Sequence, residues 1–244
     1  MDIAFFCEHF IVCQIIKDMK KVLFVLPSHD QLGNTGQKTG YWLEEFASPY
    51  YEFVDNEYEV TIASPKGGKP PIDPKSMLKE NQTESTQRLQ NDKSATDKLN
   101  NTLILNQVSA SNYDTLFLPG GHGPMWDLSQ DKDLKKIVED FYNNQKVISA
   151  VCHGPAGLLQ AIDKNGDSIL KNKRVTGFTN SEEKTVKLDK TVPFSLEDRL
   201  KELGGNFEKT ENFEPFIVSD GQIITGQNPA SSFLAAKKVV EILR

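Results

Sequence analysis

Cysteine is scarce in this chain of 244 residues, and the three cysteines are Cys7, Cys13 and Cys152. Their number and spacing exclude a disulfide framework and a cysteine-based zinc site, and no HxxxH or CxxC spacing occurs. We therefore expect no bound metal and a reducing, cytoplasmic setting. The P-loop pattern GxxxxGK[ST] is absent and the glycine run at 120–123 lacks GxGxxG, so we also expect no nucleotide cofactor.

Basic residues are the minority among the charged ones, with 28 Lys and Arg against 34 Asp and Glu, which gives a net charge of −6. A nucleic-acid partner would favour a basic face, so we expect none. No stretch reaches the roughly 20 consecutive apolar residues of a membrane span, so we expect no membrane partner. Hydrophobic residues make up 38% of the chain, which fits a globular protein rather than a disordered one.

Residues 1–18 hold many apolar side chains, but Asp2 and Glu8 interrupt them. A secretory signal needs a basic start and an unbroken apolar run, so a signal is the less favoured interpretation. We predict a leader or a non-native extension over 1–18, with a natural start at Met19 as an alternative. The rest, 19–244, reads as a single domain with a polar insertion at about 65–105.

Strand-like and helix-like segments alternate along 19–244, which predicts an α/β fold with a mostly parallel sheet covered by helices on both faces. Apolar or β-branched runs predict strands at 21–27, 58–64, 115–118, 146–151 and 174–178, and a hairpin at 216–225. The segment 102–108 is either a short strand or the start of a helix. Amphipathic or capped segments predict helices at 41–56 (broken or kinked by Pro49), 133–144, 153–162, 195–203 and 229–243. The polar stretch 79–101 is either a surface helix or a mobile lid.

The strongest chemical signal is a buried strand that runs directly into Cys152-His153-Gly154-Pro155. This arrangement is typical of a nucleophile elbow, a sharp strand-to-helix turn that lifts one side chain above the sheet. A helix N-terminus there would favour the thiolate of Cys152. A buried structural cysteine is the alternative. His153 is a candidate base, and either Glu182 or Glu183 could orient it, because both follow the next predicted strand.

Two further segments reach the same predicted edge of the sheet. Gly120 and Gly121 end the strand at 115–118, and their N–H groups could receive an oxyanion, although a tight turn is the simpler interpretation. Glu44 and Glu45 open the first helix, where a carboxylate near the thiol could shuttle a proton. From the pattern alone, ordinary surface charge is the better interpretation for either glutamate.

Taken together, the motifs resemble those of the ThiJ/PfpI superfamily, in particular its heat-shock glyoxalase and holdase branch. The resemblance spans about 19–244. It is carried by KTGYWLEE, PKGGKPPIDP, LPGGHG, AVCHGP, TGFTNSEE and TGQNPAS. It implies a flavodoxin-like three-layer sandwich.

Position by position, the resemblance implies that Cys152 is the nucleophile, His153 the triad histidine, Glu183 the acidic third member and Glu45 the buried carboxylate beside the thiol. It also implies an oxyanion hole at Gly121 and His153, next to Gly120. The implied activity is a cofactor-independent, glutathione-independent glyoxalase that converts methylglyoxal and water to lactate. Members of this branch are usually homodimers, and some are described as chaperones of unfolded proteins.

Other functions remain open at this point. A holdase, a protein deglycase and a cysteine-based redox sensor would use the same fold. A glutamine amidotransferase would need a GxCxG elbow and a later histidine, and the four histidines stand at 9, 29, 122 and 153. The same shortage of a downstream histidine counts against an ordinary Cys–His peptidase.

Overall fold

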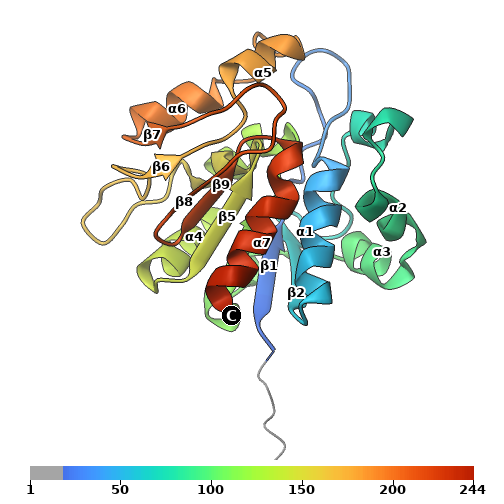
Figure 1. Cartoon of the computed structure of the whole chain (residues 1–244), viewed down its shortest axis with the longest axis horizontal. Helices are drawn as coiled ribbons and strands as arrows, with labels where there is room; N and C mark the ends of the chain where they lie inside the picture. The colour runs from blue at the N-terminus through green and yellow to red at the C-terminus, as the bar shows by residue number, and fades with distance from the viewer. Residues whose placement is uncertain (1–18) are drawn as a thin grey trace, which may run out of the picture.

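A seven-stranded sheet forms the centre of the molecule in a computed structural model that describes residues 19–244 (Figure 1). The strand order is β3-β2-β1-β4-β5-β9-β8, and only β8 runs antiparallel to its neighbour. The strands of this sheet are β1 (Lys21–Val25), β2 (Glu59–Ser64), β3 (Leu103–Ile104), β4 (Thr115–Leu118), β5 (Val147–Val151), β8 (Ile217–Asp220) and β9 (Ile223–Gly226). The predicted parallel sheet is thus confirmed, and so is the hairpin near its end.

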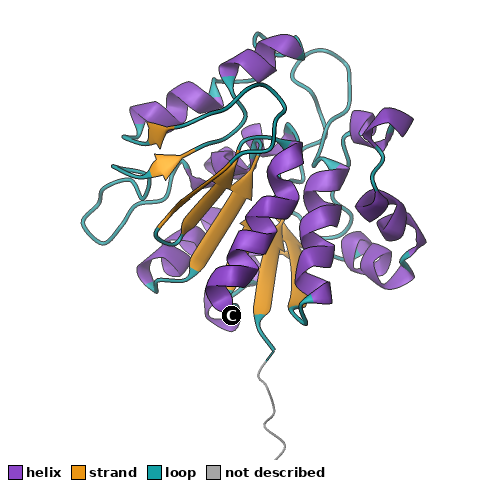
Figure 2. Cartoon of the chain, viewed as in Figure 1, coloured by secondary structure: helices purple, strands orange, loops and turns teal. Residues whose placement is uncertain are grey.

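Helices cover both faces of the sheet and make three layers (Figure 2). Helices α1 and α7 pack side by side on one face, and α4 packs on the other. The α-helices are α1 (Leu43–Asp55), α2 (Glu84–Asn91), α3 (Lys93–Asn100), α4 (Lys132–Asn143), α5 (Asn180–Thr185), α6 (Leu196–Glu202) and α7 (Ser232–Leu243). Eight short 3-10 helices, η1 to η8, lie between them in the described part of the chain.

The apolar strand runs explain why this sheet forms. β4 and β5 are buried at every position, as parallel strands between two helical layers must be. Two apolar clusters result, one between the sheet and α4 and one between the sheet and α1 with α7. Phe24 and Phe117, on adjacent strands, belong to the second cluster with ring centroids 5.1 Å apart.

Three local predictions need correction. The segment 174–178 does not join the central sheet; only Arg174–Val175 forms a strand, β6, which pairs with β7 (Asn206–Phe207) in a separate small sheet. After His153 no α-helix runs to Ile162. Instead a five-residue 3-10 helix, η7 (Gly154–Leu158), follows, because Pro155 lacks an N–H and the glycines at 154 and 157 disfavour a helix.

Pro49 does not interrupt α1, which continues unbroken to Asp55. Pro49 is an interior residue of α1, and its side chain is buried. Apolar packing therefore outweighs the loss of the hydrogen bond that proline cannot donate. In the polar insertion, the stretch 79–101 contains two short helices, of which α2 packs against α1 and α3 against β2. The leader predicted over 1–18 lies outside the described residues.

Candidate active site

Cys152 follows β5 directly, at the carboxyl edge of the sheet. Its φ is +57°, in the left-handed region that side chains with a Cβ rarely adopt. Two backbone hydrogen bonds hold this conformation: Cys152 N–H donates to Gly226 O at 2.9 Å, and Phe178 N–H donates to Cys152 O at 2.9 Å. The chain therefore turns sharply at Cys152, and both adjoining segments hold it there.

His153 lies against the sulfur of its neighbour, with Nδ1 3.3 Å from Cys152 Sγ. The other ring nitrogen, Nε2, is 2.8 Å from Glu183 Oε2. Burial lowers the pKa of His153, so the imidazole is neutral near pH 7. An ionised Glu183 accepts a hydrogen bond, which places the proton of His153 on Nε2 and leaves Nδ1 free to accept the thiol proton.

His122 is a second histidine on the same carboxylate, and sequence reasoning did not identify it. Its Nε2 donates to Glu183 Oε1 at 2.8 Å, and its ring packs 4.2 Å from that of His153. The two imidazoles hold the pKa of Glu183 well below its usual range, although burial alone would raise it. The available signal was the position of His122, directly after the two glycines that follow β4, the strand next to β5.

Glu45 reaches the thiol from α1. Its side chain is fully buried, and Oε2 accepts a 2.7 Å hydrogen bond from the backbone N–H of Gly120. Oε1 has no hydrogen-bond partner of good geometry within 19–244, but the carboxyl is close enough to Cys152 for each group to shift the pKa of the other. Burial raises the pKa of Glu45 to about 8, so this carboxyl is protonated at neutral pH.

The thiol itself is buried and lies near carboxyl groups. Burial, followed by the nearby Glu45, raises the pKa of Cys152, whereas a hydrogen bond from the Gly121 backbone N–H lowers it. The expected stabilisation by a helix N-terminus is therefore wrong, because the five-residue η7 replaces the helix. The thiol has to give up its proton on attack, and His153 Nδ1 is the adjacent acceptor.

Gly120 and Gly121 bring the backbone after β4 against the site. A Cβ on Gly120 would lie 2.5 Å from His153 N and 2.8 Å from Glu45 Oε2. Gly121 has φ +83°, and a Cβ there would lie 2.4 Å from Gly40 O. Only glycine fits at either position. The Gly120 N–H is directed at Glu45, and the Gly121 N–H at the sulfur.

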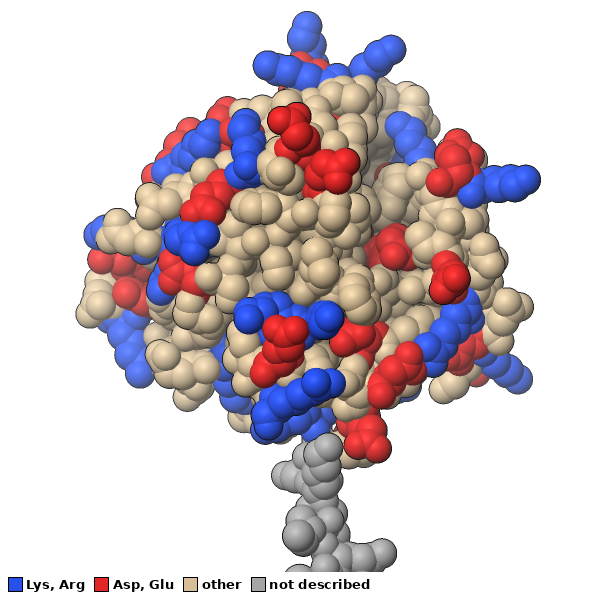
Figure 3. Space-filling model, viewed as in Figure 1, with Lys and Arg blue, Asp and Glu red and all other residues tan. Residues whose placement is uncertain are grey.

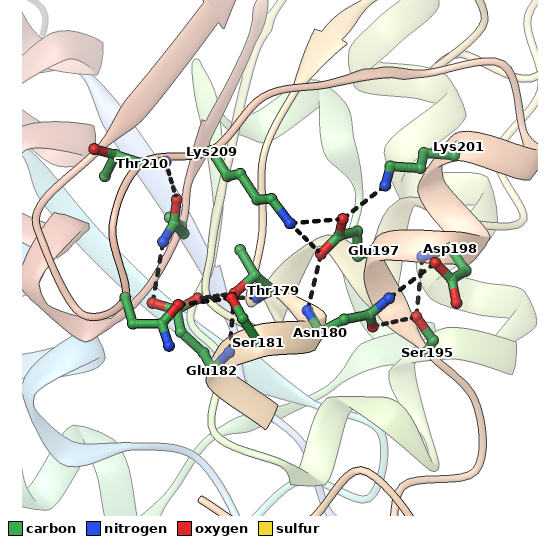
Figure 4. Close-up of polar contacts among 12 residues, drawn as sticks. Thr179, Asn180, Ser181, Glu182, Ser195, Glu197, Asp198, Lys201, Lys209 and Thr210 are labelled. Carbon is green, nitrogen blue, oxygen red and sulfur yellow. Dashed lines mark hydrogen bonds and ion pairs between the residues drawn. The ribbon is translucent and has the colours of Figure 1, made fainter. Parts of the chain in front are cut away.

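Glu182 and Glu183 are adjacent, yet they point to different networks. Glu182 is fully buried and accepts from Phe213 N–H at 2.8 Å and Asn228 Nδ2 at 2.9 Å with Oε1. Its Oε2 accepts from the N–H of Thr179, which caps α5. Figure 4 shows Glu182 in this network and Glu197 in a second one beside it. Glu182 therefore fixes the loops around the site, whereas Glu183 contacts both histidines.

A pocket of about 550 Å³ opens above Cys152. Aromatic side chains form much of its wall: Phe178 packs 4.6 Å from the ring of His153, and Phe213 packs 6.3 Å from Phe178. Both Phe213 and Phe233 are largely exposed at the pocket. Residues 80–83 of the polar insertion line the pocket as well. A small organic molecule can thus reach the sulfur between apolar and polar walls.

His122, His153 and Glu183 form a cluster whose potential metal-ligand atoms lie within 4.8 Å of one another. These residue types are suitable ligands for zinc. In the structure, however, each histidine Nε2 is directed at a separate oxygen of Glu183 at 2.8 Å. Hydrogen bonding between the three side chains thus accounts for their proximity.

The architecture and the site define a class: α/β proteins with helices on both faces of a largely parallel sheet and a cysteine, a histidine and an acid at its carboxyl edge. The chain belongs to the DJ-1/PfpI family, which it matches over residues 38–242. No helix within 19–244 has the length and apolar character needed to cross a membrane.

Individual relatives cover nearly the whole chain. It is 31% identical to the glutathione-independent glyoxalase HSP31 of Saccharomyces cerevisiae, over 92% of this chain and 98% of the relative. Among solved structures, the Rapid Encystment Protein 24 KDa of Francisella tularensis is similar with a TM-score of 0.89 and 40% identity, covering 93% of this chain and all of that one. Glyoxalase III of Candida albicans has a TM-score of 0.85 and 29% identity, covering 91% and 97%.

Proposed function

We propose that this protein is a glutathione-independent glyoxalase that converts methylglyoxal and related 2-oxoaldehydes, with water, into lactate without a cofactor. The observation that carries the proposal is the arrangement around Cys152. The sulfur lies beside both the neutral imidazole of His153, which Glu183 orients, and the protonated carboxyl of Glu45. The names of the relatives from yeast and Candida albicans support the same activity.

The first step joins the thiol to the aldehyde. His153 Nδ1 accepts the proton of Cys152 as sulfur bonds to the aldehyde carbon, which produces a hemithioacetal. The developing oxyanion is received by the backbone N–H groups of Gly121 and His153 beside the sulfur. Gly120 has a different role, because its N–H already holds Glu45.

The second step moves hydrogen between the two substrate carbons. A proton leaves the former aldehyde carbon and another is added to the neighbouring carbonyl carbon, so the first carbon is oxidised and the second reduced within one molecule. Glu45 and His153 relay these protons, which needs groups that exchange a proton near neutral pH. Water then breaks the resulting thioester, restores the thiol and gives lactate and one proton.

His122 acts in this proposal as a positioning residue. Its hydrogen bond occupies Glu183 Oε1 and leaves Oε2 to accept from His153. The carboxylate is thus held from both sides, and the tautomer of His153 with an unprotonated Nδ1 is maintained.

The activity assay follows methylglyoxal consumption and lactate formation in the absence of glutathione and added metal. We expect turnover by the wild type, none by Cys152→Ala, and a loss of about 100-fold or more for Glu45→Gln, because the amide cannot relay a proton. Glu52→Gln, two turns further along α1, is the matched control and should keep wild-type activity. A wild type that forms no lactate although Cys152 still reacts with alkylating reagents would refute the glyoxalase assignment.

The assembly and location are also proposed here. A cytoplasmic homodimer that acts on a small-molecule substrate would match the family resemblance and the low number of cysteines in the chain. Light scattering on the purified chain tests the dimer, and a mass equal to one chain would refute it.

A second candidate function, holding unfolded proteins, is favoured by one observation: Phe213 and Phe233 expose 42% and 46% of their surfaces at the pocket mouth. Exposed apolar groups that lie together can bind apolar clients. Suppression of citrate synthase aggregation by Cys152→Ala as well as by the wild type would support this function. No suppression by either protein would refute it.

A further inference from the structure

The pocket above Cys152 has a one-sided charge. Among the described residues that line it, Glu44 and Glu80 are acidic, Glu45 is the protonated carboxyl beside the thiol, and none is a lysine or an arginine. Lys79 and Lys187 are neighbours in sequence of lining residues but do not line the pocket themselves. In Figure 3, uncharged side chains cover the centre of the face formed by α1 and α7. Acidic side chains lie above and to the right of this area, basic ones lie to its upper left, and both kinds lie below it. A carboxylate ligand would therefore meet no lysine or arginine among the described lining residues.

The polar insertion fixes one of these glutamates at the pocket wall. The hydroxyl of Thr83 donates a hydrogen bond to Glu44 Oε2, and the same hydroxyl accepts from Thr86 N–H at 3.2 Å to cap α2. Glu44 is thereby tied to the first turn of a helix in the insertion. Glu80 belongs to η2 (Lys79–Asn81), on the same wall, and its side chain is exposed.

The proposed reaction changes the charge of the molecule in the pocket. Methylglyoxal is neutral, whereas lactate is an anion. Glyoxylate is an aldehyde of similar size to methylglyoxal that carries a carboxylate in place of the acetyl group. A wall of carboxylates raises the free energy of bound lactate and bound glyoxylate relative to that of bound methylglyoxal, because like charges repel across a pocket of low polarity.

We propose that the acidic wall formed by Glu44 and Glu80 restricts the pocket to uncharged carbonyl compounds and promotes release of the anionic product. The identities of substrate and product rest on the proposed function. The exclusion of anions from Cys152 does not, since it follows from the charges of the lining residues alone. It also gives a role to residues 80–83 of the insertion.

The size of the effect follows from two carboxylates, of which Glu44 is half-buried and Glu80 is exposed. An exposed ion pair is worth a factor of about 1.5 to 5 in an equilibrium constant, and repulsion by one partly exposed carboxylate is of the same order. Two such groups together should change relative access by about 2- to 25-fold. The effect should decrease as ionic strength rises from about 0.02 to about 0.5 M, because salt screens exposed charges.

The experiment compares two reagents that differ by one charge. Iodoacetamide and iodoacetate both alkylate a thiolate with loss of iodide, and mass spectrometry can follow the modification of Cys152 alone. The amide-to-acetate rate ratio is normalised to that of a small free thiol. We expect a normalised ratio well above one in the wild type, a fall of about 1.5- to 5-fold in Glu44→Gln and in Glu80→Gln, and a larger fall in the double variant.

Glu241→Gln is the control, since it removes the same charge from the far end of α7 and should leave the ratio unchanged. In Glu44→Gln the new amide retains an oxygen that can accept from Thr83, so this variant removes the charge but keeps the hydrogen bond to the insertion. A ratio that is the same in wild type, both variants and the control would overturn the proposal, as would an equal fall in the control.

A second measurement separates this proposal from the proposed function. If the protein forms lactate, inhibition by added lactate and by glyoxylate should strengthen about 1.5- to 5-fold in each variant. If it forms none but the alkylation ratio behaves as expected, the glyoxalase assignment fails and the anion-excluding wall stands. If the protein forms lactate but the alkylation ratio does not change in the Glu44 and Glu80 variants, the glyoxalase assignment stands and the anion-excluding wall is refuted.

Discussion

Gly120 donates its backbone N–H to Glu45 Oε2 at 2.7 Å, so the strand that precedes the site fixes the carboxyl beside the thiol. Glu45 comes from α1 and Gly120 follows β4, 75 residues later in the chain. This single contact fills one oxygen of a fully buried carboxyl and leaves the other without a partner of good geometry in the described chain. The free energy of burying Glu45 therefore depends on its protonation.

We expect the stability of the protein to fall as pH rises because of Glu45. Its pKa is raised from 4.5 to about 8, so its stabilising contribution is complete below pH 4.5 and is lost as pH approaches 8. The difference amounts to at most about 5 kcal/mol. Urea unfolding of wild type and Glu45→Gln between pH 5 and 8 measures it. Parallel curves for the two proteins would show that Glu45 does not titrate in this range.

The backbone at Cys152 gives a second prediction. Because φ is +57°, Cys152→Gly should be more stable than Cys152→Ala by about 1 kcal/mol, even though glycine is the smaller residue. Thermal unfolding of the two variants tests this. Ala150 is inside β5 and not in the left-handed region. There the wild-type alanine should be more stable than Ala150→Gly.

His122 should affect catalysis through Glu183. We expect His122→Leu to lower kcat about 10- to 100-fold with a small change in KM, because Glu183 loses one of its two imidazole donors. His122→Gln can donate from its amide to the same oxygen and should recover most of the loss. If the two variants are equally impaired, His122 exchanges protons with the substrate itself rather than positioning Glu183. The acidic limb of the plot of kcat against pH should shift in His122→Leu and not in His122→Gln.

Glu182→Gln should destabilise the fold by about 3 kcal/mol. The carboxylate accepts hydrogen bonds at both oxygens, so an amide nitrogen would face a donor whichever way the side chain turns. Glu202→Gln, whose exposed side chain pairs with Arg199, should change stability by less than about 0.5 kcal/mol. Chemical unfolding compares the two variants. Equal stabilities would mean that the Glu182 network adds little to the fold.

Much of the fold could be predicted because burial leaves a clear mark on parallel strands. β1, β4 and β5 are short apolar runs, and the last of them leads directly to Cys152. The strand β6 was misplaced because it has two residues, too few for a pattern to show which sheet it joins. The helix expected after His153 failed because Pro155 and the glycines around it favour a tighter turn.

The site was predicted unevenly for a similar reason. Cys152 and His153 are adjacent in the chain, so a local pattern reveals them. The contact between His122 and Glu183 joins residues 61 positions apart and depends on β4 lying next to β5. The partners of Glu45 are likewise set by strand order. Sequence patterns predict which residues reach the carboxyl edge, whereas the sheet determines which of them meet.

The close backbone contacts at Gly40 and Gly121 separate the parts of this protein that can change from those that cannot. A Cβ on Gly40 would lie 1.9 Å from Pro71 O, and one on Gly121 would lie 2.4 Å from Gly40 O. The base of the site is thus built from main chain packed on main chain, with no room for new side chains. The pocket above this base is lined by Thr83, Phe213 and their neighbours, which belong to separate segments of the chain. Selection for a different carbonyl compound could therefore alter those segments one at a time while the reacting groups keep their places.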